Sequence, residues 1–397
     1  MSDTPETESA EELDWIPLSD PDVSIAEIAA VTDALRSPRL SAGQRVADFE
    51  DEFAAAHGRR YGVATSSGVI ATWLALRALG LGPGDEVIAA AYSWHQVAHA
   101  ISHAGATPVF ADIDYWSGCL SPQKAADRIT PATRAIIAGN CNGHPADWQA
   151  LRSLAGERGI ALIEDSTEAI GSRYQGRMVG TFGDMAVFDF SQPSALCCGE
   201  GGMVLTDDPA LATELRYLRA HSLEDRRSVS VGSRAPLSAN MSELTAALGL
   251  AQLERLDEIL ARRKRVESWY LEEMQSFEGI KPPYLAPDVD EVHWMLYVVH
   301  LGTRFTASAR NQIVDDVETE AIEVAPYSHP LHQQFHYQRY GEASNCGRGR
   351  LAITERIADR SLALPFHAHL TQDHIKFIVK TLKDASTNVG AGAAIYL

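Results

Sequence analysis

The pattern of apolar and polar positions divides the chain into short buried strands and amphipathic helices. Short apolar runs predict strands at residues 61–65, 86–90, 108–113, 134–139, 160–164, 203–206 and 294–301. Helical spacing of apolar residues, such as Phe49, Phe53 and Ala56, predicts helices at residues 41–57, 69–79, 243–263 and 371–385. The polar motifs that carry candidate chemistry lie at the ends of these strands.

The chain of 397 residues is longer than a usual single domain, so we expect two. We predict a flexible acidic leader at residues 1–17, a large domain at 18–263, a small C-terminal domain at 264–385 and a mobile tail at 386–397. A hinge is expected near Pro282-Pro283, and no internal repeat is present.

Composition narrows the possible partners and location. The formal net charge of −19 argues against nucleic acid, whose phosphates would be repelled. No apolar run reaches the length of about eighteen residues that a membrane helix needs, and the acidic N-terminus is unlike a signal peptide. The five cysteines are scattered, which predicts reduced thiols in a cytoplasm.

Two local patterns suggest ligand binding. Ser66-Ser67-Gly68 joins a strand to a helix, where backbone N–H groups favour an anion, although such a tripeptide most often only caps a helix. Trp94 is a flat surface for a planar ligand. His95, His99 and His103 share a helix face, but a solvated face is the commoner role and no zinc spacing occurs, so we predict no metal.

Two longer motifs are more specific. Residues 164–171 read Glu-Asp-Ser-Thr-Glu-Ala-Ile-Gly, and residues 188–202 run from Phe188 to Gly202 through Gly-Glu-Gly-Gly. Together with the patterns above, in the same order, they make residues 18–383 resemble the DegT/DnrJ/EryC1/StrS family of sugar and cyclitol aminotransferases. The resemblance implies an α/β fold of aminotransferase fold type I, with a mixed, mostly parallel sheet flanked by helices and a smaller C-terminal α+β domain.

The resemblance also implies positions around pyridoxal phosphate (PLP), the family's cofactor. It matches Ser67 and Gly68 to the phosphate, Trp94 to the stacking aromatic and Asp165 to the carboxylate that pairs with the pyridine nitrogen. The residues expected at the substrate are Trp94, His221, His329 and Asn240. Ser238 matches a position that reaches the phosphate of a neighbouring subunit, so a homodimer with its site at the interface is expected.

This chain departs from the family at the central positions. Ser194 stands where the family has its Schiff-base lysine, and a serine hydroxyl forms no imine. The departing positions are Val69, Glu168, Asp189, Ser194, Ser238 and Asn240. A carboxylate about 4 Å from a phosphate costs on the order of 4 kcal/mol, or roughly a thousandfold in affinity. We therefore expect no cofactor, with non-covalent PLP or pyridoxamine phosphate (PMP) as the alternative.

Three functions are compatible with these changes. The first is an enzyme that acts on an amine-bearing sugar, cyclitol or related metabolite by acid–base chemistry, through dehydration, cyclisation or epimerisation. Its candidate catalytic residues are Glu168, Asp189, Ser194, Asp165 and His95. The second is a non-catalytic subunit of an active paralogue. The third is a sugar aminotransferase or dehydratase that uses PMP or PLP without an internal aldimine.

Overall fold

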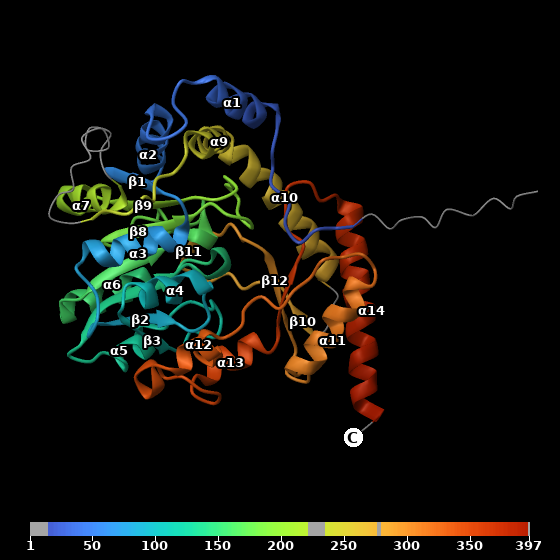
Figure 1. Cartoon of the computed structure of the whole chain (residues 1–397). Coiled ribbons are helices and arrows are strands. Elements are labelled where there is room, and N and C mark those ends of the chain that lie inside the picture. Colours follow the sequence, from blue (N-terminus) through green and yellow to red (C-terminus); the bar gives the residue numbers. More distant parts are fainter. Residues whose placement is uncertain (1–14, 221–234, 276–278, 396–397) are drawn as a thin grey trace, which may run out of the picture.

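The computed structural model describes residues 15–220, 235–275 and 279–395. Its centre is a seven-stranded sheet in the order β1-β9-β8-β5-β4-β2-β3 (Figure 1). The strands from β8 to β3 in this order run parallel, whereas β9 is antiparallel to both β1 and β8. The sheet is thus mixed and mostly parallel, which confirms the expected fold class.

The strands of this sheet are short and almost fully buried, as their apolar sequences require when helices cover both faces. Their bounds are β1 Tyr61–Thr65, β2 Glu86–Ala90, β3 Thr107–Ala111, β4 Thr133–Gly139, β5 Ala161–Asp165, β8 Met185–Asp189 and β9 Gly202–Thr206. Six of them coincide within a few residues with the predicted strands. The seventh, β8, falls partly in the 188–202 motif and was not predicted.

Helices cover the two faces of the sheet. One face packs against helices α3 Gly68–Ala78, α4 His95–His103 and α7 Pro209–Arg219. The other packs against α2 Gln44–Ala56, α6 Trp148–Arg158 and the C-terminal part of the chain. The remaining helices of this part are α1 Ile25–Arg36, α5 Pro122–Ala126 and α9 Glu243–Glu254.

The C-terminal part is built on an antiparallel sheet in the order β10-β12-β13. Its elements are α10 Leu256–Met274, β10 Ile280–Lys281, β12 Tyr297–Leu301, α11 Ala307–Glu318, α12 Phe335–Gln338, α13 Ala352–Ala358, β13 Ser361–Leu364 and α14 Gln372–Ile395. A third small sheet joins β11 Val289–Glu291 to β6 Arg173–Tyr174 and β7 Arg177–Met178. This part is the small α+β unit that the resemblance implied.

Local boundaries differ from the sequence expectations in two places. The single helix expected at 243–263 is two helices, α9 and α10, which are separated at Arg255; the guanidinium of this residue pairs with Asp22 at 3.0 Å and Glu27 at 2.5 Å. The helix expected to end at residue 385 continues to Ile395 as α14, where a mobile tail was predicted; Val389 is buried in it.

The predicted domain limits remain a prediction. Helix α10 is continuous across residue 263, the proposed boundary. Residues 1–14 of the predicted leader lie outside the described part, whereas Ile16 is buried and its backbone bonds to Ala321 at 2.9 Å.

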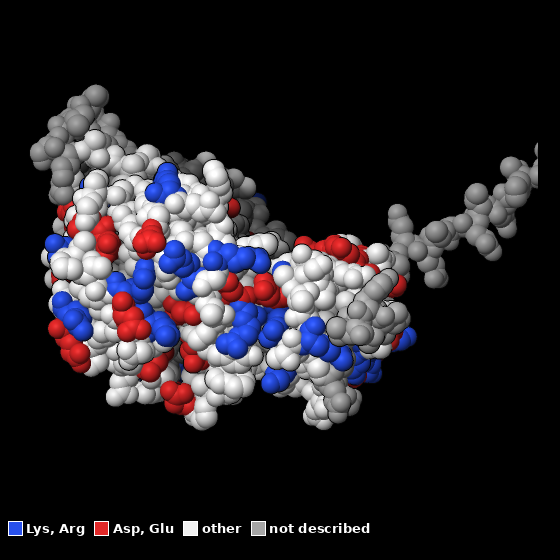
Figure 2. Space-filling model, turned by 90° about the horizontal axis from the view of Figure 1, so that it is seen from below, with Lys and Arg blue, Asp and Glu red and all other residues white. Residues whose placement is uncertain are grey.

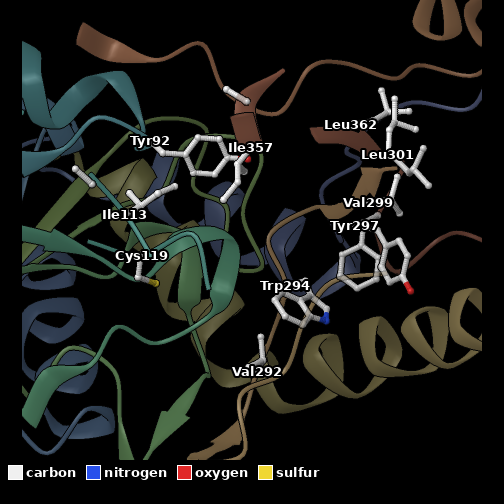
Figure 3. Packing of buried hydrophobic residues seen from close by; sticks show 14 of the residues in the cluster. Tyr92, Ile113, Cys119, Val292, Trp294, Tyr297, Val299, Leu301, Ile357 and Leu362 are labelled. Carbon is white, nitrogen blue, oxygen red and sulfur yellow. The ribbon is translucent and has the colours of Figure 1, made fainter. Parts of the chain in front are cut away.

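One hydrophobic core runs through both parts. Figure 3 shows Tyr92, Ile113 and Cys119 from the large-sheet side together with Trp294 and Tyr297 from the C-terminal side, all in one cluster of buried residues. Because apolar contacts are continuous across the two parts, their relative position is set by packing.

The surface carries both signs of charge. On the face seen from below, Lys and Arg are interspersed with Asp and Glu (Figure 2). Within the described residues, no helix is long and apolar enough to cross a membrane.

Arg263, in the middle of α10, ties this helix to the C-terminal part. Its side chain is buried, and its guanidinium donates to the carbonyl oxygens of Phe366, Trp294 and Met295 at 3.0, 2.9 and 2.7 Å. Burial lowers the pKa of Arg263 to about 10. The carbonyl groups offset part of the cost of burying this cation.

We predict that Arg263→Ala lowers the free energy of unfolding by on the order of 3 kcal/mol, because it leaves buried carbonyls unpaired and opens a cavity. The control is Arg265→Ala, an exposed arginine of the same helix, which should change stability by less than about 0.5 kcal/mol. Urea denaturation of the purified variants measures both. Equal stabilities of the two variants would contradict the assigned role of Arg263.

Candidate active site

The end of β5 is held by a buried carboxylate. Glu164 is fully buried and accepts hydrogen bonds from the backbone N–H groups of Gly180 at 2.5 Å and Phe182 at 2.7 Å. It also accepts one from the Asn140 side chain at 3.1 Å, and the Asn140 oxygen accepts one from the Trp148 indole at 2.8 Å. The ends of β4 and β5 and the loop before β8 are therefore fixed together.

Asp165 and Glu168 follow directly at this fixed strand end. Both are buried. Oε2 of Glu168 accepts very short hydrogen bonds from the backbone N–H of Asn142 and from the Tyr327 hydroxyl. Oδ1 of Asp165 accepts from the Thr167 N–H at 3.1 Å. The two carboxyl groups thus lie close enough for their charges to interact.

Burial makes both carboxyl groups hard to ionise. It raises the pKa of Glu168 to about 7, although the hydrogen bonds from Tyr327 and Asn142 act in the opposite direction. It also raises the pKa of Asp165 to about 6, to which the negative charge of Asp189 contributes. Burial raises the pKa of Tyr327 well above its usual value, so this phenol stays neutral. Near neutral pH, Glu168 is therefore poised to gain or lose a proton.

Asp189 directs its carboxylate at the beginning of α3. Its Oδ2 accepts a hydrogen bond from the Gly68 N–H at 2.8 Å, and its Oδ1 accepts one from the Ser191 N–H at 2.6 Å. Asp189 is only 2% exposed. Ser67 caps the helix, since its Oγ accepts from the Ile70 N–H at 3.4 Å. The carboxylate thus occupies the place where a helix N-terminus favours an anion.

A cavity of about 310 Å³ opens beside Glu168. Its lining includes three of the predicted residues, Trp94, His95 and His329, besides Glu168 itself. His95 is exposed to solvent, yet the surrounding protein lowers its pKa, an effect that the charge of Asp189 opposes. Together with His99, the structure therefore brings a carboxyl group, three imidazoles and an indole to one cavity.

The cavity also contains His99, which was expected on a solvated helix face, and four residues that were not predicted for the site: Tyr327, Ser328, Leu331 and Gln334. The pairing of Tyr327 with Glu168 joins residues 159 positions apart, which no local pattern reveals. A signal did exist for Asn142, since Asn142-Gly143 is a typical turn pair and Asn142 has a φ of 49°.

Ser194 lies in the loop after β8, apart from this cavity. Its Oγ accepts a hydrogen bond from the Leu196 N–H at 3.3 Å in the same loop. All six lysines of the chain are in the described part, and none lines the cavity. Lys264, for example, pairs with Glu267 at 2.7 Å on α10.

The remaining predicted residues lie near the α3 N-terminus or outside the described part. The Ser66 N–H donates to the Ala239 carbonyl at 3.0 Å, which brings the segment of exposed Ser238 and half-buried Asn240 alongside the start of α3. His221 lies outside the described residues. Within those residues, no group of three or more His, Cys, Asp or Glu side chains is arranged to hold a metal ion.

Comparison with known proteins relates this arrangement to a large family. The model of the DegT/DnrJ/EryC1/StrS aminotransferase family matches residues 21–383. The spore coat polysaccharide biosynthesis protein SpsC of Bacillus subtilis is 34% identical and covers 93% of this chain and 97% of its own length. The GDP-perosamine synthase of Caulobacter vibrioides is 35% identical, with 86% and 90% covered.

Solved structures show the same fold with a cofactor. The putative sugar aminotransferase Spr1654 of Streptococcus pneumoniae has been solved in a PMP form and a PLP form. Its PMP form aligns with a TM-score of 0.88 at 26% identity, covering 94% of this chain and 98% of the other. These PLP-dependent relatives contradict the prediction that a protein of this kind has no cofactor, and that prediction is withdrawn.

The residues of this chain do not fit PLP in a lysine-linked, phosphate-anchored form. The lysine-matched loop offers Ser194, and the Gly68 N–H at the start of α3 already donates to Asp189. A Cβ built on Gly68 would overlap the Asp189 carboxylate, so no free space remains there. Asp165, by contrast, is present and buried at the strand end. The fit fails at the attachment point and at the phosphate, not at Asp165.

We predict that Glu168 makes stability fall as pH rises. Because its folded-state pKa is raised from 4.5 to about 7, the folded protein prefers the protonated form. This contribution is complete below pH 4.5 and is lost as pH rises through about 7. Glu168→Gln should therefore become more stable relative to the wild type, by on the order of 3 kcal/mol between about pH 4 and pH 8.

Urea denaturation at a series of pH values measures this difference. Glu157→Gln, which changes an exposed glutamate of α6, is the matched control and should follow the wild type at every pH. A wild-type protein that gains stability over Glu168→Gln as pH rises would show that the ionised carboxylate is the favoured form.

Proposed function

Because the chain belongs to the DegT/DnrJ/EryC1/StrS aminotransferase family, we propose that it is a sugar-modifying enzyme acting on an amine-bearing sugar or cyclitol. The relatives support this substrate class, since one is named for GDP-perosamine and another for a spore coat polysaccharide. The observation that carries the proposal is the Glu168–Tyr327 pair in the wall of the 310 Å³ cavity.

Glu168 acts as the acid–base group. A catalytic carboxyl works best when its pKa lies near the working pH, and burial raises the pKa of Glu168 to about 7. Among the described residues, Asn142 and Tyr327 donate hydrogen bonds to the Glu168 carboxyl group, and both bonds go to Oε2. The other oxygen, Oε1, is the one that exchanges a proton with the substrate. Tyr327 and Asn142 hold the carboxyl group in place while Oε1 takes up or returns a proton.

The other cavity residues bind and orient the sugar. Trp94 offers an apolar face to the ring, and His95 and His329 offer nitrogen atoms to its hydroxyl groups. The carboxylates of Asp165 and Asp189 give the site a negative character that suits a protonated amine. This arrangement supports epimerisation, dehydration or cyclisation of a keto substrate, in which Glu168 takes a proton from a carbon beside the carbonyl group and the carbonyl oxygen takes up the electron pair.

The enzyme acts as a homodimer in a reducing cytoplasm. Support for the dimer comes from apolar side chains on and beside α1, where Ile25, Ile28 and Leu35 are 83%, 60% and 58% exposed. Support for the location comes from the cysteines, all five of which are free thiols.

We predict that Glu168→Gln abolishes proton exchange at the substrate. The purified full-length protein is incubated in D₂O with a panel of nucleotide-linked amino sugars and keto sugars that includes GDP-perosamine, and deuterium incorporation is followed by ¹H NMR. Loss of the proton-transfer group should slow exchange at least about a hundredfold. The wild-type rate should rise through about pH 7 if Glu168 acts as the base, and Glu168→Gln should lack this rise.

Glu157→Gln serves again as the exposed control and should exchange at the wild-type rate. Tyr327→Phe should move the rise in exchange rate to higher pH, because losing the hydrogen bond from the Tyr327 hydroxyl raises the pKa of Glu168. If no sugar of the panel exchanges or is turned over, the acid–base function is refuted. Activity that appears only on mixing with an active family member would then indicate a non-catalytic subunit.

A further inference from the structure

We propose that the Asp189 carboxylate is a built-in anion at the N-terminus of α3 and determines whether a phosphate group can bind there. This inference concerns ligand selection and goes beyond the acid–base function proposed above. It explains why the chain can keep the fold of a PLP family and yet present a different site.

The register of the sheet positions Asp189 for this role. Asp189, the last residue of β8, is paired with Gly202 of β9, and Gly202 is paired with Thr65, the last residue of β1. Gly202 lies between them without a side chain. The carboxylate of Asp189 therefore crosses the strand end and reaches the Gly68 N–H, 121 positions away in sequence, at 2.8 Å.

The Asp189 side chain fills the space at the N-terminus of α3 and also supplies the negative charge that this helix end favours. Asp189 is 2% exposed, and a Cβ added to Gly68 would overlap its carboxylate and the Gln96 side chain. A second backbone donor, the Ser191 N–H, holds the other carboxylate oxygen at 2.6 Å. Asp189 thus takes two backbone donors at this helix end, and a phosphate reaches them only after Asp189 has moved.

The charges around this position also disfavour a phosphate. Asp165 lies close enough for the Asp189 charge to raise its pKa, although burial is the larger cause. A phosphate dianion brought to α3 would therefore meet two carboxyl groups. A like charge at about 4 Å weakens binding by roughly a thousandfold at an intermediate dielectric. A PLP or PMP molecule bound to the wild-type chain consequently places its phosphate elsewhere or displaces Asp189.

The test is calorimetric titration of the full-length protein with PLP and with pyridoxal, which lacks the phosphate. Asp189→Ser removes the carboxylate and leaves the Gly68 N–H open. We expect this variant to bind PLP at least tenfold more tightly than the wild type, with no comparable gain for pyridoxal. Asp127→Ser, at the exposed end of α5, is the matched control and should leave both affinities unchanged.

Equal PLP affinity in the wild type and Asp189→Ser would overturn the proposal, and so would an equal gain for PLP and pyridoxal. Thermal unfolding verifies that each variant is folded. Should Asp189→Ser fail to fold, Asp189→Ala gives the answer, because it removes the charge and also frees the space and the Gly68 N–H. A gain for PLP over pyridoxal in Asp189→Ala supports the proposal, and no gain contradicts it.

Discussion

The site depends on the buried hydrogen bonds of Glu164. This carboxylate sits at the end of a central strand, where an unpaired charge would be very costly, and the backbone N–H groups of Gly180 and Phe182 make its burial possible. Asn140 extends the network to the neighbouring strand. Because these groups fix the strand end, the next residues, Asp165 and Glu168, enter the site at defined positions. The proton chemistry of the site therefore rests on a group that does not itself react.

The fold is that of a PLP enzyme, but the charged groups at the positions that would anchor the cofactor differ from those expected. The fold keeps the strand-end carboxylate Asp165 and the helix α3 that begins at Gly68. At the two places where a lysine-linked cofactor would be anchored, it has Ser194 in a surface loop and Asp189 on Gly68. What remains is a cavity whose reactive group is a buried carboxyl with a pKa near neutrality. The chain can therefore resemble sugar aminotransferases over residues 21–383 and still differ from them at Ser194 and Asp189.

The sequence predicted what depends on local pattern. Apolar runs located six strands of the seven-stranded sheet, and the motifs located Glu168 and Trp94, which line one cavity. It did not reveal Tyr327 as the partner of Glu168, because that contact joins two distant segments. The break between α9 and α10 at Arg255 was also missed, as were the ion pairs of Arg255 with Asp22 and Glu27, which again join distant segments.

The bond between Tyr327 and Glu168 has a mechanical consequence. Tyr327 belongs to a segment whose Ala325 pairs with Ala363 of the small sheet, whereas Glu168 is anchored to the large one. Any opening that separates the two sheets withdraws the Tyr327 donor but also admits water to Glu168, and because burial is the larger cause of the raised pKa, the carboxyl group becomes a stronger acid. Conversely, a ligand that draws the sheets together keeps water out and makes it a weaker acid. The protonation state of Glu168 therefore depends on how closely the two sheets approach each other.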